Sequence, residues 1–434
     1  MDIAVIGLGK LGAPLAAVLA SKGHRVIGVD HDPKAVAAIN AGRAPVAEPG
    51  LQACIDQARD RLRATGDYAE AIGASALSYV IVPTPSGPDG RFGNHFVLDA
   101  VRRIGAALRE TTQYHVVNIA STMMPGSCGG DIRTALEAAS GRVVGVDVGL
   151  CYNPEFIALG SVVHDLLHPD MVLIGQSDPR AGDVVEAVYR GILATAPAVR
   201  RMGWVDAELT KIAVNTFVTT KISYANMLGE ICERLPGADV DVVTAALGMD
   251  SRIGPKYLRA ALGYGGPCFP RDNVALAALA RGLGLRADVA EATDSVNRRQ
   301  AARVVALIGR LAGGNPGTVA VLGMAYKPDT PVVDESQGVL IAGALAAAGH
   351  RVFIADPEAL EAARAVLGDR VTAAATAEAA IAVAGIVVIA TPARAFRALP
   401  PAAFGGGKIV LDCWRILPAS VADVADVVHL GRGL

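Results

Sequence analysis

The stretch Ile3-Ala-Val-Ile-Gly-Leu-Gly-Lys-Leu-Gly12 decides the fold of this chain. Its apolar start predicts a short strand, and the alanine-rich segment that follows, to about Ser21, predicts a helix. A second expected strand, Gly23-His-Arg-Val-Ile-Gly-Val-Asp30, ends in an acidic residue 18 positions after Gly12. The G-x-G-x-x-G spacing therefore stands between a strand and a helix, the context in which it forms a dinucleotide-binding turn.

Each glycine of this turn has its own expected task. Gly7 makes the tight turn, Gly9 lets the backbone approach a pyrophosphate, and Gly12 allows the helix to pack closely on the strand. The N–H groups at the helix N-terminus suit phosphate oxygens. Asp30 is expected to bind the ribose hydroxyls and to repel a 2′-phosphate, which favours NAD over NADP as the cofactor. The alternative is a nucleotide-free glycine turn in an α/β domain.

Strands and helices alternate through the rest of the first half. Four further strands are expected at residues 79–82, 116–120, 143–148 and 171–174. This alternation is typical of a doubly wound parallel sheet, whose ligands bind at the carboxyl ends of the strands. Three loops are expected there: Pro83-Thr84-Pro85, Ser121-Thr122-Met-Met-Pro-Gly126 and Asn153-Pro-Glu155-Phe156.

The last third of the chain repeats the first. Ala320-Val-Leu-Gly323 echoes Ala4-Val-Ile-Gly7 at an offset of 316, and Gly349-His-Arg-Val352 is identical to Gly23-His-Arg-Val26 at an offset of 326. The later copy therefore carries ten extra residues between the two matches, and Asp356 ends its second strand as an acidic residue. We interpret this segment as a second Rossmann-like domain that binds a different, nucleotide-bearing ligand.

A long helical pattern at residues 205–232 lies between the two copies. It places Lys211 and Asn215 on one face, because they are four residues apart, and a set of apolar residues on another: Leu209, Ile212, Ala213 and Phe217. On the pattern alone, a solvated lysine and a helix-interior asparagine are the alternative.

A loop rich in glycine and proline follows, Leu262-Gly-Tyr-Gly-Gly-Pro-Cys-Phe-Pro-Arg-Asp272. Glycines let a backbone come close to a ligand, and prolines stiffen the frame around it. The loop holds one thiol, Cys268, shortly before Arg271 and Asp272. This setting favours Cys268 as a nucleophile over the alternative, a buried structural thiol.

Length and composition limit the remaining possibilities. The 434 residues suffice for two or three domains, and 52% hydrophobic with 19% charged residues is typical of a globular protein. A net charge of -2 gives no reason to expect nucleic-acid or membrane binding. We expect a cytoplasmic protein, because no leader segment and no membrane-spanning run is evident. The cysteines and histidines lack metal-ligand spacing, so neither a metal site nor disulfides are expected.

The chain resembles the UDP-glucose/GDP-mannose dehydrogenase family over nearly its whole length. The matching segments are the glycine turn, Glu48-Pro-Gly-Leu51, Val82-Pro-Thr-Pro85, Ser121-Thr122 with Pro125-Gly126, Asn153-Pro-Glu-Phe156, Ala207-Glu-Leu-Thr-Lys211 with Asn215, Gly265-Gly-Pro-Cys-Phe-Pro-Arg-Asp272 and Leu322-Gly-Met-Ala-Tyr-Lys-Pro-Asp-Thr330. The resemblance implies three parts. Residues 1–200 would form an NAD-binding Rossmann domain, residues 201–300 a central helical domain that dimerises and carries the Cys268 loop, and residues 301–434 a Rossmann-like domain for a nucleotide sugar.

The resemblance also implies the chemistry. A primary alcohol of the sugar would be oxidised to a carboxylate with two NAD+ in succession, most often UDP-glucose to UDP-glucuronate. Cys268 would attack the intermediate aldehyde to form a thiohemiacetal, and then a thioester that water hydrolyses. Lys211, Asn215 and Asp272 would surround the reacting carbon, and Glu155 and Thr122 would transfer protons or position water.

Binding residues are implied in the same way. The expected NAD contacts are Gly7, Gly9, Leu11, Gly12, Asp30, Thr84, Thr122 and Arg271. The expected nucleotide-sugar contacts are Glu155, Lys211, Asn215, Tyr257, Leu258, Arg259, Gly265 and Lys327, while Arg252 would reach the substrate of a neighbouring subunit in a homodimer.

Four positions depart from the family pattern. Arg271 stands where the family usually has lysine, Leu159 where a second glutamate is common, and Met171 and Asp334 where arginines are common. Two alternatives therefore stay open. One is a dehydrogenase of the same family that acts on another substrate, UDP-N-acetylhexosamine, GDP-mannose or an unusual polar alcohol, and that either completes both oxidations or stops at the aldehyde. The other is a non-catalytic nucleotide-sugar-binding protein.

Overall fold

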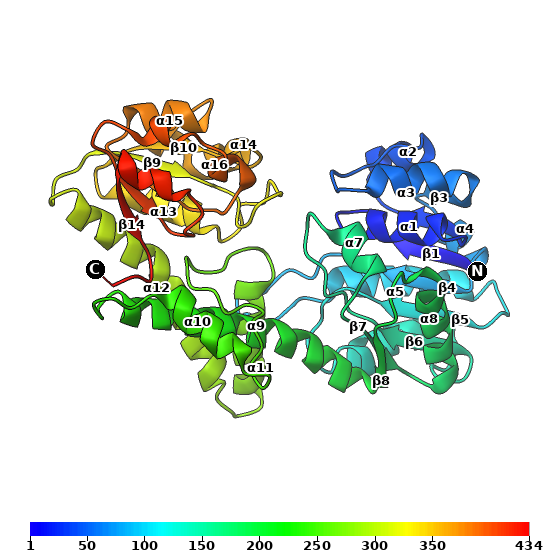
Figure 1. Ribbon diagram of the computed structural model, residues 1–434. Coiled ribbons are helices and arrows are strands. Elements are labelled where there is room, and N and C mark those ends of the chain that lie inside the picture. Colours follow the sequence, from blue (N-terminus) through cyan, green and yellow to red (C-terminus); the bar gives the residue numbers. More distant parts are fainter. Residues whose placement is uncertain (434) are drawn as a thin grey trace. The chain divides into compact units, whose positions relative to one another are not determined.

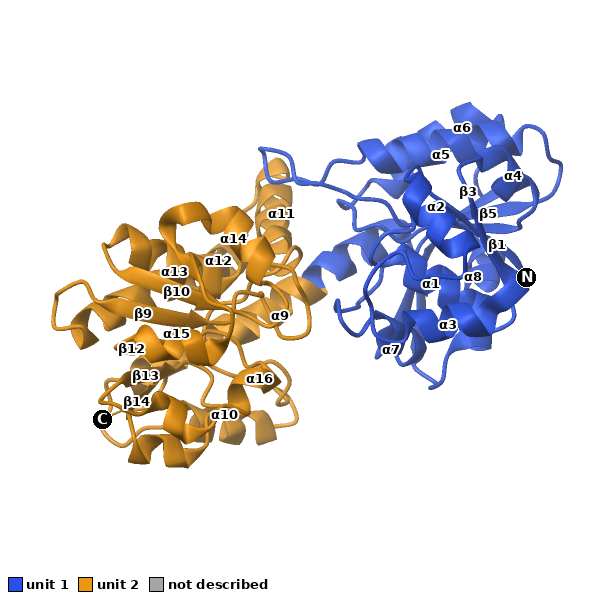
Figure 2. Cartoon of the chain, turned by 90° about the horizontal axis from the view of Figure 1, so that it is seen from above, with its two compact units in different colours: residues 1–213 blue, residues 214–434 orange. Residues whose placement is uncertain are grey.

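The computed structural model describes residues 1–433 (Figure 1). The chain divides into two compact units, Met1–Ala213 and Val214–Leu434 (Figure 2). Each unit contains a sheet of its own with helices on both faces, which confirms the predicted α/β class with two Rossmann-like sheets. The division into three domains at residues 200 and 300 stays a prediction.

The first unit holds an eight-stranded sheet in the order β3-β2-β1-β4-β5-β6-β7-β8. Its strands are β1 (Asp2–Ile6), β2 (Arg25–Val29), β3 (Leu62–Thr65), β4 (Leu77–Val80), β5 (His115–Ile119), β6 (Val148–Tyr152), β7 (Met171–Gln176) and β8 (Ala198–Met202). All neighbouring pairs are parallel except β6 and β7, which run antiparallel. The sheet is therefore doubly wound, with one reversal that the sequence did not predict.

Two of the expected features of this sheet need correction. The strand expected at residues 143–148 is wrong, because β6 begins at Val148 and the preceding residues form a turn closed by a hydrogen bond from Asp147 N to Val143 O at 2.9 Å. The edge strands β3 and β8 were not predicted at all. In both, arginine interrupts the apolar residues and part of the strand is exposed, so neither has the apolar run by which the inner strands are recognised.

Helices cover both faces of the first sheet. They are α1 (Gly12–Ser21), α2 (Pro33–Asn40), α3 (Leu51–Ala58), α4 (Tyr68–Gly73), α5 (His95–Leu108), α6 (Arg133–Ser140), α7 (Val162–Leu167) and α8 (Pro179–Ile192). One core cluster packs α1, α3 and α8 on the sheet, and another packs α5 and α6. Nearly every residue of α1 is buried, which its small and apolar side chains allow.

The second unit holds a fully parallel sheet in the order β11-β10-β9-β12-β13-β14, the same order as the first six strands of the other sheet. Its strands are β9 (Thr318–Leu322), β10 (Arg351–Ala355), β11 (Thr372–Ala373), β12 (Ile386–Ile389), β13 (Ile409–Asp412) and β14 (Asp426–His429). Its helices are α13 (Gln337–Ala347), α14 (Leu360–Leu367), α15 (Ala377–Val383) and α16 (Arg394–Arg397). This topology confirms that the internal repeat is a structural duplication.

Four longer helices lie between the two sheets in sequence. They are α9 (Trp204–Cys232), α10 (Val240–Met249), α11 (Phe269–Gly282) and α12 (Asp288–Leu311). The long helical prediction is confirmed by α9. Lys211 and Asn215 share one face as predicted, and that face is buried, whereas among the apolar residues expected on another face only Ile212 is fully buried. Leu209 and Phe217 are 42% and 68% exposed, whereas Lys211 and Asn215 are only 8% and 9% exposed. The buried face of α9 is polar because hydrogen-bond partners lie along it.

Candidate functional site

The glycine turn of the first unit has the geometry that its spacing predicts. Gly7 adopts a φ of +96°, and a Cβ on Gly12 would lie 1.8 Å from Gly7 O, so neither position tolerates a side chain. A Cβ on Gly9, in contrast, would have no protein atom within 4 Å. The protein itself thus requires the outer two glycines, and the middle one keeps the backbone open to a pyrophosphate group.

Asp30 has a second role that the sequence did not predict. Its Oδ2 accepts a hydrogen bond from Leu8 N at 2.6 Å, and its Oδ1 accepts one from Asp32 N at 2.8 Å. In the second unit, Asp356 Oδ2 accepts from Met324 N at 2.6 Å in the same way. The acidic residue that ends the second strand therefore anchors the glycine turn in both copies, and ribose binding by Asp30 stays a prediction.

The ten-residue insertion of the second copy can now be placed. A Cβ on Gly338 would lie 1.9 Å from Gly323 O, which reproduces the contact between Gly12 and Gly7. Gly338 follows Gly12 at the offset of 326, so the insertion falls between Gly323 and Gly338. We call residues 324–337 the inserted segment.

The predicted residues Thr84 and Thr122 lie just after β4 and β5, which are neighbouring strands. Thr84 is buried and Thr122 is partly buried. Ser121 ties the two loops together, because its hydroxyl donates to Val82 O at 2.7 Å and accepts from Val82 N at 2.9 Å. Both threonines are therefore at the edge of the sheet where a Rossmann domain binds its ligand.

Glu155 belongs to a hydrogen-bonded group after β6. The Tyr189 hydroxyl lies 2.7 Å from Asn153 Oδ1 and 3.2 Å from Glu155 Oε1. Burial raises the pKa of Glu155 to about 7, although the Tyr189 hydrogen bond and the charge of Lys211 both favour the carboxylate. A carboxyl group that titrates near neutral pH is suited to proton transfer. Sequence reasoning missed Tyr189, which belongs to no motif.

Lys211 is held against the same loop. Its Nζ donates to the backbone oxygen of Glu155 and lies 4.7 Å from the centroid of the Phe156 ring. One turn earlier, Glu208 accepts hydrogen bonds from Gly126 N at 2.6 Å and Cys128 N at 2.8 Å. The Ala207–Lys211 motif thus fixes the start of α9 to two loops of the first unit.

Cys268 lies at the N-cap of α11 in the second unit and is exposed. The other cysteines are buried or, for Cys54, half-buried. In the first turn of α11, Asp272 is only 1% exposed, and its Oδ2 accepts a hydrogen bond from Asn215 Nδ2 at 2.6 Å. Arg271 Nε lies 3.6 Å from Asp272 Oδ1. The structure therefore brings together Asn215, Asp272 and Arg271 beside the thiol-bearing turn.

The glycines before Cys268 face the protein, which changes how we interpret them. A Cβ on Gly265 would lie 2.3 Å from Glu335 O, and a Cβ on Gly266 would lie 2.6 Å from Tyr326 Cε2. Gly266 N also donates to Asp334 O at 2.8 Å. These glycines let the loop lie on the inserted segment, so the expectation that they serve close approach of a ligand does not describe their contacts here.

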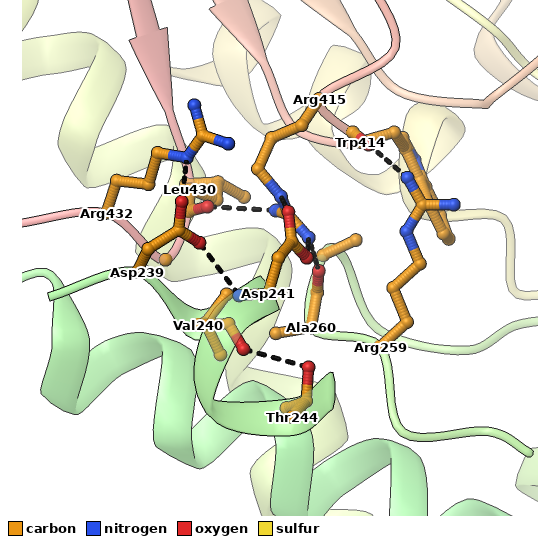
Figure 3. Close-up of polar contacts among 12 residues, drawn as sticks. Asp239, Val240, Asp241, Thr244, Arg259, Ala260, Trp414, Arg415, Leu430 and Arg432 are labelled. Atoms are coloured by element: carbon orange, nitrogen blue, oxygen red, sulfur yellow. Dashed lines mark hydrogen bonds and ion pairs between the residues drawn. The ribbon is translucent and has the colours of Figure 1, made fainter. Parts of the chain in front are cut away.

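The expected substrate segment at residues 257–261 is tied to the turn after β13 (Figure 3). The Arg415 guanidinium pairs with both Asp241 oxygens, at 2.6 and 2.8 Å, and donates to Ala260 O. Arg259 donates to Trp414 O. Each arginine thus links the helical part of the second unit to its sheet.

The remaining predicted substrate residues vary in their surroundings. Leu258 is buried, whereas Tyr257 is exposed with a φ of +65°. Lys327 Nζ lies 6.0 Å from the centroid of the Tyr326 ring, next to the Cys268 loop. Arg252 is exposed and forms a two-pronged ion pair with Asp250. These positions neither support nor oppose the predicted contacts.

Three of the positions that depart from the family pattern have distinct surroundings. Leu159 packs on the core cluster that contains α1, where a second glutamate would lack apolar contacts. Met171 opens β7 and pairs with Ala198 of β8. Asp334 contributes its backbone oxygen to the Cys268 loop, and its side chain is exposed.

Among residues 1–433, no group of three or more His, Cys, Asp or Glu side chains could hold a metal ion. Within the same residues, no helix combines the length and apolar character needed to cross a membrane.

Comparison with known proteins agrees with the site. Residues 1–193 match the NAD binding domain of the UDP-glucose/GDP-mannose dehydrogenase family, residues 205–299 its central domain, and residues 320–419 its UDP binding domain. Two Rossmann-like sheets and an NAD-binding domain define the class as NAD-dependent oxidoreductases. The chain belongs to the UDP-glucose/GDP-mannose dehydrogenase family.

Individual relatives cover most of the chain. It is 38% identical to the UDP-glucose 6-dehydrogenase AglM of Haloferax volcanii over 83% of this chain and 84% of the relative. It is 36% identical to a GDP-mannose 6-dehydrogenase of Pseudomonas putida over 82% of this chain and 81% of the relative. The structure of a UDP-glucose dehydrogenase from Pyrobaculum islandicum superposes with a TM-score of 0.91 at 36% identity and covers 100% of this chain and 98% of the other.

Proposed function

We propose that this protein oxidises carbon 6 of UDP-glucose to give UDP-glucuronate. The observation that carries the proposal is the exposed Cys268 at the start of α11, beside the buried pair of Asn215 and Asp272. The match to a UDP binding domain and the UDP-glucose dehydrogenases among the relatives support a uridine nucleotide. The relative that acts on GDP-mannose makes that sugar nucleotide the second candidate.

Gly7, Gly9, Gly12 and Asp30 would hold NAD+, which when bound would supply the hydride acceptor for each of the two oxidations. Glu155 takes the alcohol proton, directly or through a water held with Thr122, as the aldehyde forms. The Cys268 thiolate then bonds to the aldehyde carbon, and Lys211 stabilises the negative oxygen of the thiohemiacetal. Loss of the second hydride leaves a thioester, and water attacks it to release the carboxylate and regenerate the thiol.

The substrate assignment is tested with a panel of UDP- and GDP-sugars. We expect NADH formation with UDP-glucose at a kcat/KM at least about tenfold above that for GDP-mannose or UDP-N-acetylhexosamines, because a misplaced polar group leaves buried partners unpaired. If the enzyme prefers another sugar nucleotide, that sugar nucleotide is the substrate and the assignment of UDP-glucose is wrong. No NADH with any member of the panel would favour the non-catalytic alternative.

Glu155 is expected to set the acidic limb of the pH profile. Since its pKa is about 7, the carboxylate that accepts a proton increases as the pH rises through 7, and kcat/KM should rise with it. Tyr189→Phe removes a hydrogen bond that favours the carboxylate and so raises the pKa of Glu155. The midpoint of the acidic limb should therefore shift to higher pH by about half to one unit. Tyr114→Phe, whose hydroxyl lies near Asp178 instead, is the matched control. An unmoved limb in Tyr189→Phe contradicts this assignment.

The same pKa has a consequence for stability. The folded state raises the pKa of Glu155 above its ordinary value of 4.5, so the folded protein binds the proton more tightly than the unfolded chain. The contribution of protonated Glu155 to the free energy of unfolding is fully present below about pH 4.5. This contribution is lost as the pH rises towards 7. Glu155→Gln should therefore flatten the dependence of the unfolding free energy on pH in this window.

We further propose a homodimer formed through the outward face of α9. Leu209, Phe217, Tyr224 and Ile231 recur at intervals of seven or eight residues and are 42%, 68%, 47% and 48% exposed. A continuous exposed apolar stripe of this kind marks a protein interface. Such an interface also fits the expectation that Arg252 reaches the substrate of a neighbouring subunit.

The dimer is tested by sedimentation velocity. Phe217→Asp should shift the protein from dimer to monomer, because a buried unpaired charge in the interface costs several kcal/mol. Val146→Asp changes an apolar residue of equal exposure, 67%, away from α9 and should leave the dimer intact. A monomeric wild type, or a dimeric Phe217→Asp protein, would overturn the interface.

A further inference from the structure

The segment that leads to Cys268 is buried but has no regular secondary structure. Residues 260–266 are all buried, and none of them lies in a helix or strand. A buried backbone must find partners for its N–H and C=O groups, and here neighbouring strands or helical turns do not supply them. Side chains from two helices supply the partners of Ala261, Leu262 and Tyr264.

Two asparagines bond to this segment with both ends of their amides. Asn226 of α9 accepts from Ala261 N at 2.9 Å and donates to Leu262 O at 3.1 Å. Asn297 of α12 accepts from Tyr264 N at 2.7 Å and donates to Tyr264 O at 3.0 Å. Both side chains are nearly inaccessible, at 1% and 5% exposure.

The contacts continue from Tyr264 to the turn that carries Cys268. Asn273 Nδ2 lies 3.3 Å from the Tyr264 hydroxyl, 3.0 Å from Phe269 O and 2.8 Å from Thr219 Oγ1. Phe269 is the residue after Cys268. The backbone position set by Asn297 is therefore connected to the first turn of α11 through side-chain hydrogen bonds.

Local packing requires an amide at these positions. A Cβ on Gly263 would lie 2.5 Å from Asn297 Oδ1, so this glycine gives the amide its place against the backbone. An amide combines an acceptor with two donors, whereas an ionised aspartate has only acceptors and a leucine has neither. Asn226 follows Asn215 by eleven residues, about three helical turns, so both lie on one face of α9. From this face Asn215 donates to Asp272 and Asn226 donates to Leu262 O of the loop.

We propose that Asn226 and Asn297 are positioning residues that hold the Cys268 loop in its reactive geometry. The inference rests on the proposed function, in which Cys268 is the nucleophile. The two asparagines touch neither the thiol nor the reacting atoms, and they act through the backbone of residues 261–264. Their loss lowers kcat, which depends on the geometry of the thiol, more than it changes the KM for NAD+.

The test compares Asn297→Asp and Asn297→Leu with the wild type between pH 6 and 8.5. Loss of two buried hydrogen bonds should lower the kcat of the leucine variant at least about tenfold at every pH. The aspartate variant should be equally slow at pH 8.5 and should recover relative to wild type as the pH falls, because a neutral carboxyl group both donates and accepts. The Asn226→Asp variant should show the same recovery of kcat at low pH as Asn297→Asp.

A matched control is available in the first unit. Asn40 bonds to Ala64 with the same pattern, accepting from its N–H at 2.7 Å and donating to its O at 2.9 Å. Asn40→Asp should show no recovery of kcat relative to wild type at low pH.

Two results would overturn it. One is a leucine variant within about threefold of wild type, and the other is leucine and aspartate variants equally slow at all pH values. Hydrogen–deuterium exchange of the peptide spanning residues 258–266 provides a measurement without catalysis: the Ala261 and Tyr264 amides should exchange at least about tenfold faster in the aspartate variants at pH 8.5. Unchanged exchange overturns the proposal even if a leucine variant fails to fold. An inactive wild type refutes the proposed function alone, and the exchange data still decide the role of the asparagines.

Discussion

The Cys268→Ser protein is expected to form no detectable carboxylate from UDP-glucose, a loss of about 10³-fold or more in complete turnover. A serine hydroxyl is not ionised near neutral pH, so it cannot capture the aldehyde as a thiolate does. The first hydride transfer does not require the covalent bond. The variant should therefore release at most one NADH per sugar and should leave aldehyde that a hydrazine reagent traps.

Cys54→Ser is the control for this substitution, since Cys54 is half-buried and lies outside the proposed site. It should keep its activity within about twofold of wild type. Carboxylate formation by Cys268→Ser at a rate near that of Cys54→Ser would remove Cys268 from the mechanism and would leave no covalent route to the second oxidation.

The Lys211→Met protein is expected to lose about 10²–10³-fold in kcat, the usual effect of removing one positioned donor to a developing oxyanion. Methionine keeps much of the length and apolar character of the lysine chain, which lies against Phe156. The loss should appear in kcat and kcat/KM alike, because the donor acts mainly in the transition state. Steady-state kinetics with UDP-glucose and NAD+ measure both.

Lys221→Met provides a control on the same helix. Lys221 also donates to backbone oxygens, those of Ile253 and Gly254 at 3.1 and 3.2 Å. Loss of these bonds should change kcat by no more than about threefold. Equal losses in the two variants would mean that Lys211 serves α9 as an anchor and has no special part in the chemistry.

The fold was largely predictable because its signals are local or repeated. The glycine turn needs a strand before it and a helix after it, and all three are visible in sequence. The offset of 326 also located the second copy correctly, down to the Gly338 that packs on Gly323 as Gly12 packs on Gly7. The edge strands β3 and β8 were not predicted, because an edge strand needs no continuous apolar run and arginine interrupts the apolar residues of both.

The helical pattern of α9 did not reveal which of its faces is buried. Periodicity identifies an apolar stripe but does not say whether that stripe meets the chain's own core or another surface. On α9 the stripe through Phe217 is exposed, and the buried face carries Lys211 and Asn215 with their partners. The interpretation of these two residues therefore depended on family resemblance and could not come from the helical pattern.

Residues that hold the site residues or the Cys268 loop in place could not be identified from the sequence. Tyr189 beside Glu155, and Asn226 and Asn297 on the Cys268 loop, belong to no motif and have no spacing that marks them. Their partners are distant in the chain, so only the folded structure identifies them. The glycines of the loop, in contrast, were noticed at once but serve contacts with the inserted segment.

The central claim is that one cysteine enables two successive oxidations of one sugar, and product stoichiometry tests it most directly. A limiting amount of UDP-glucose is consumed by the wild-type enzyme with excess NAD+, and both NADH and product mass are measured. We predict two NADH per sugar and a product with the mass of UDP-glucuronate. One NADH per sugar, with the aldehyde as the product, would contradict the account.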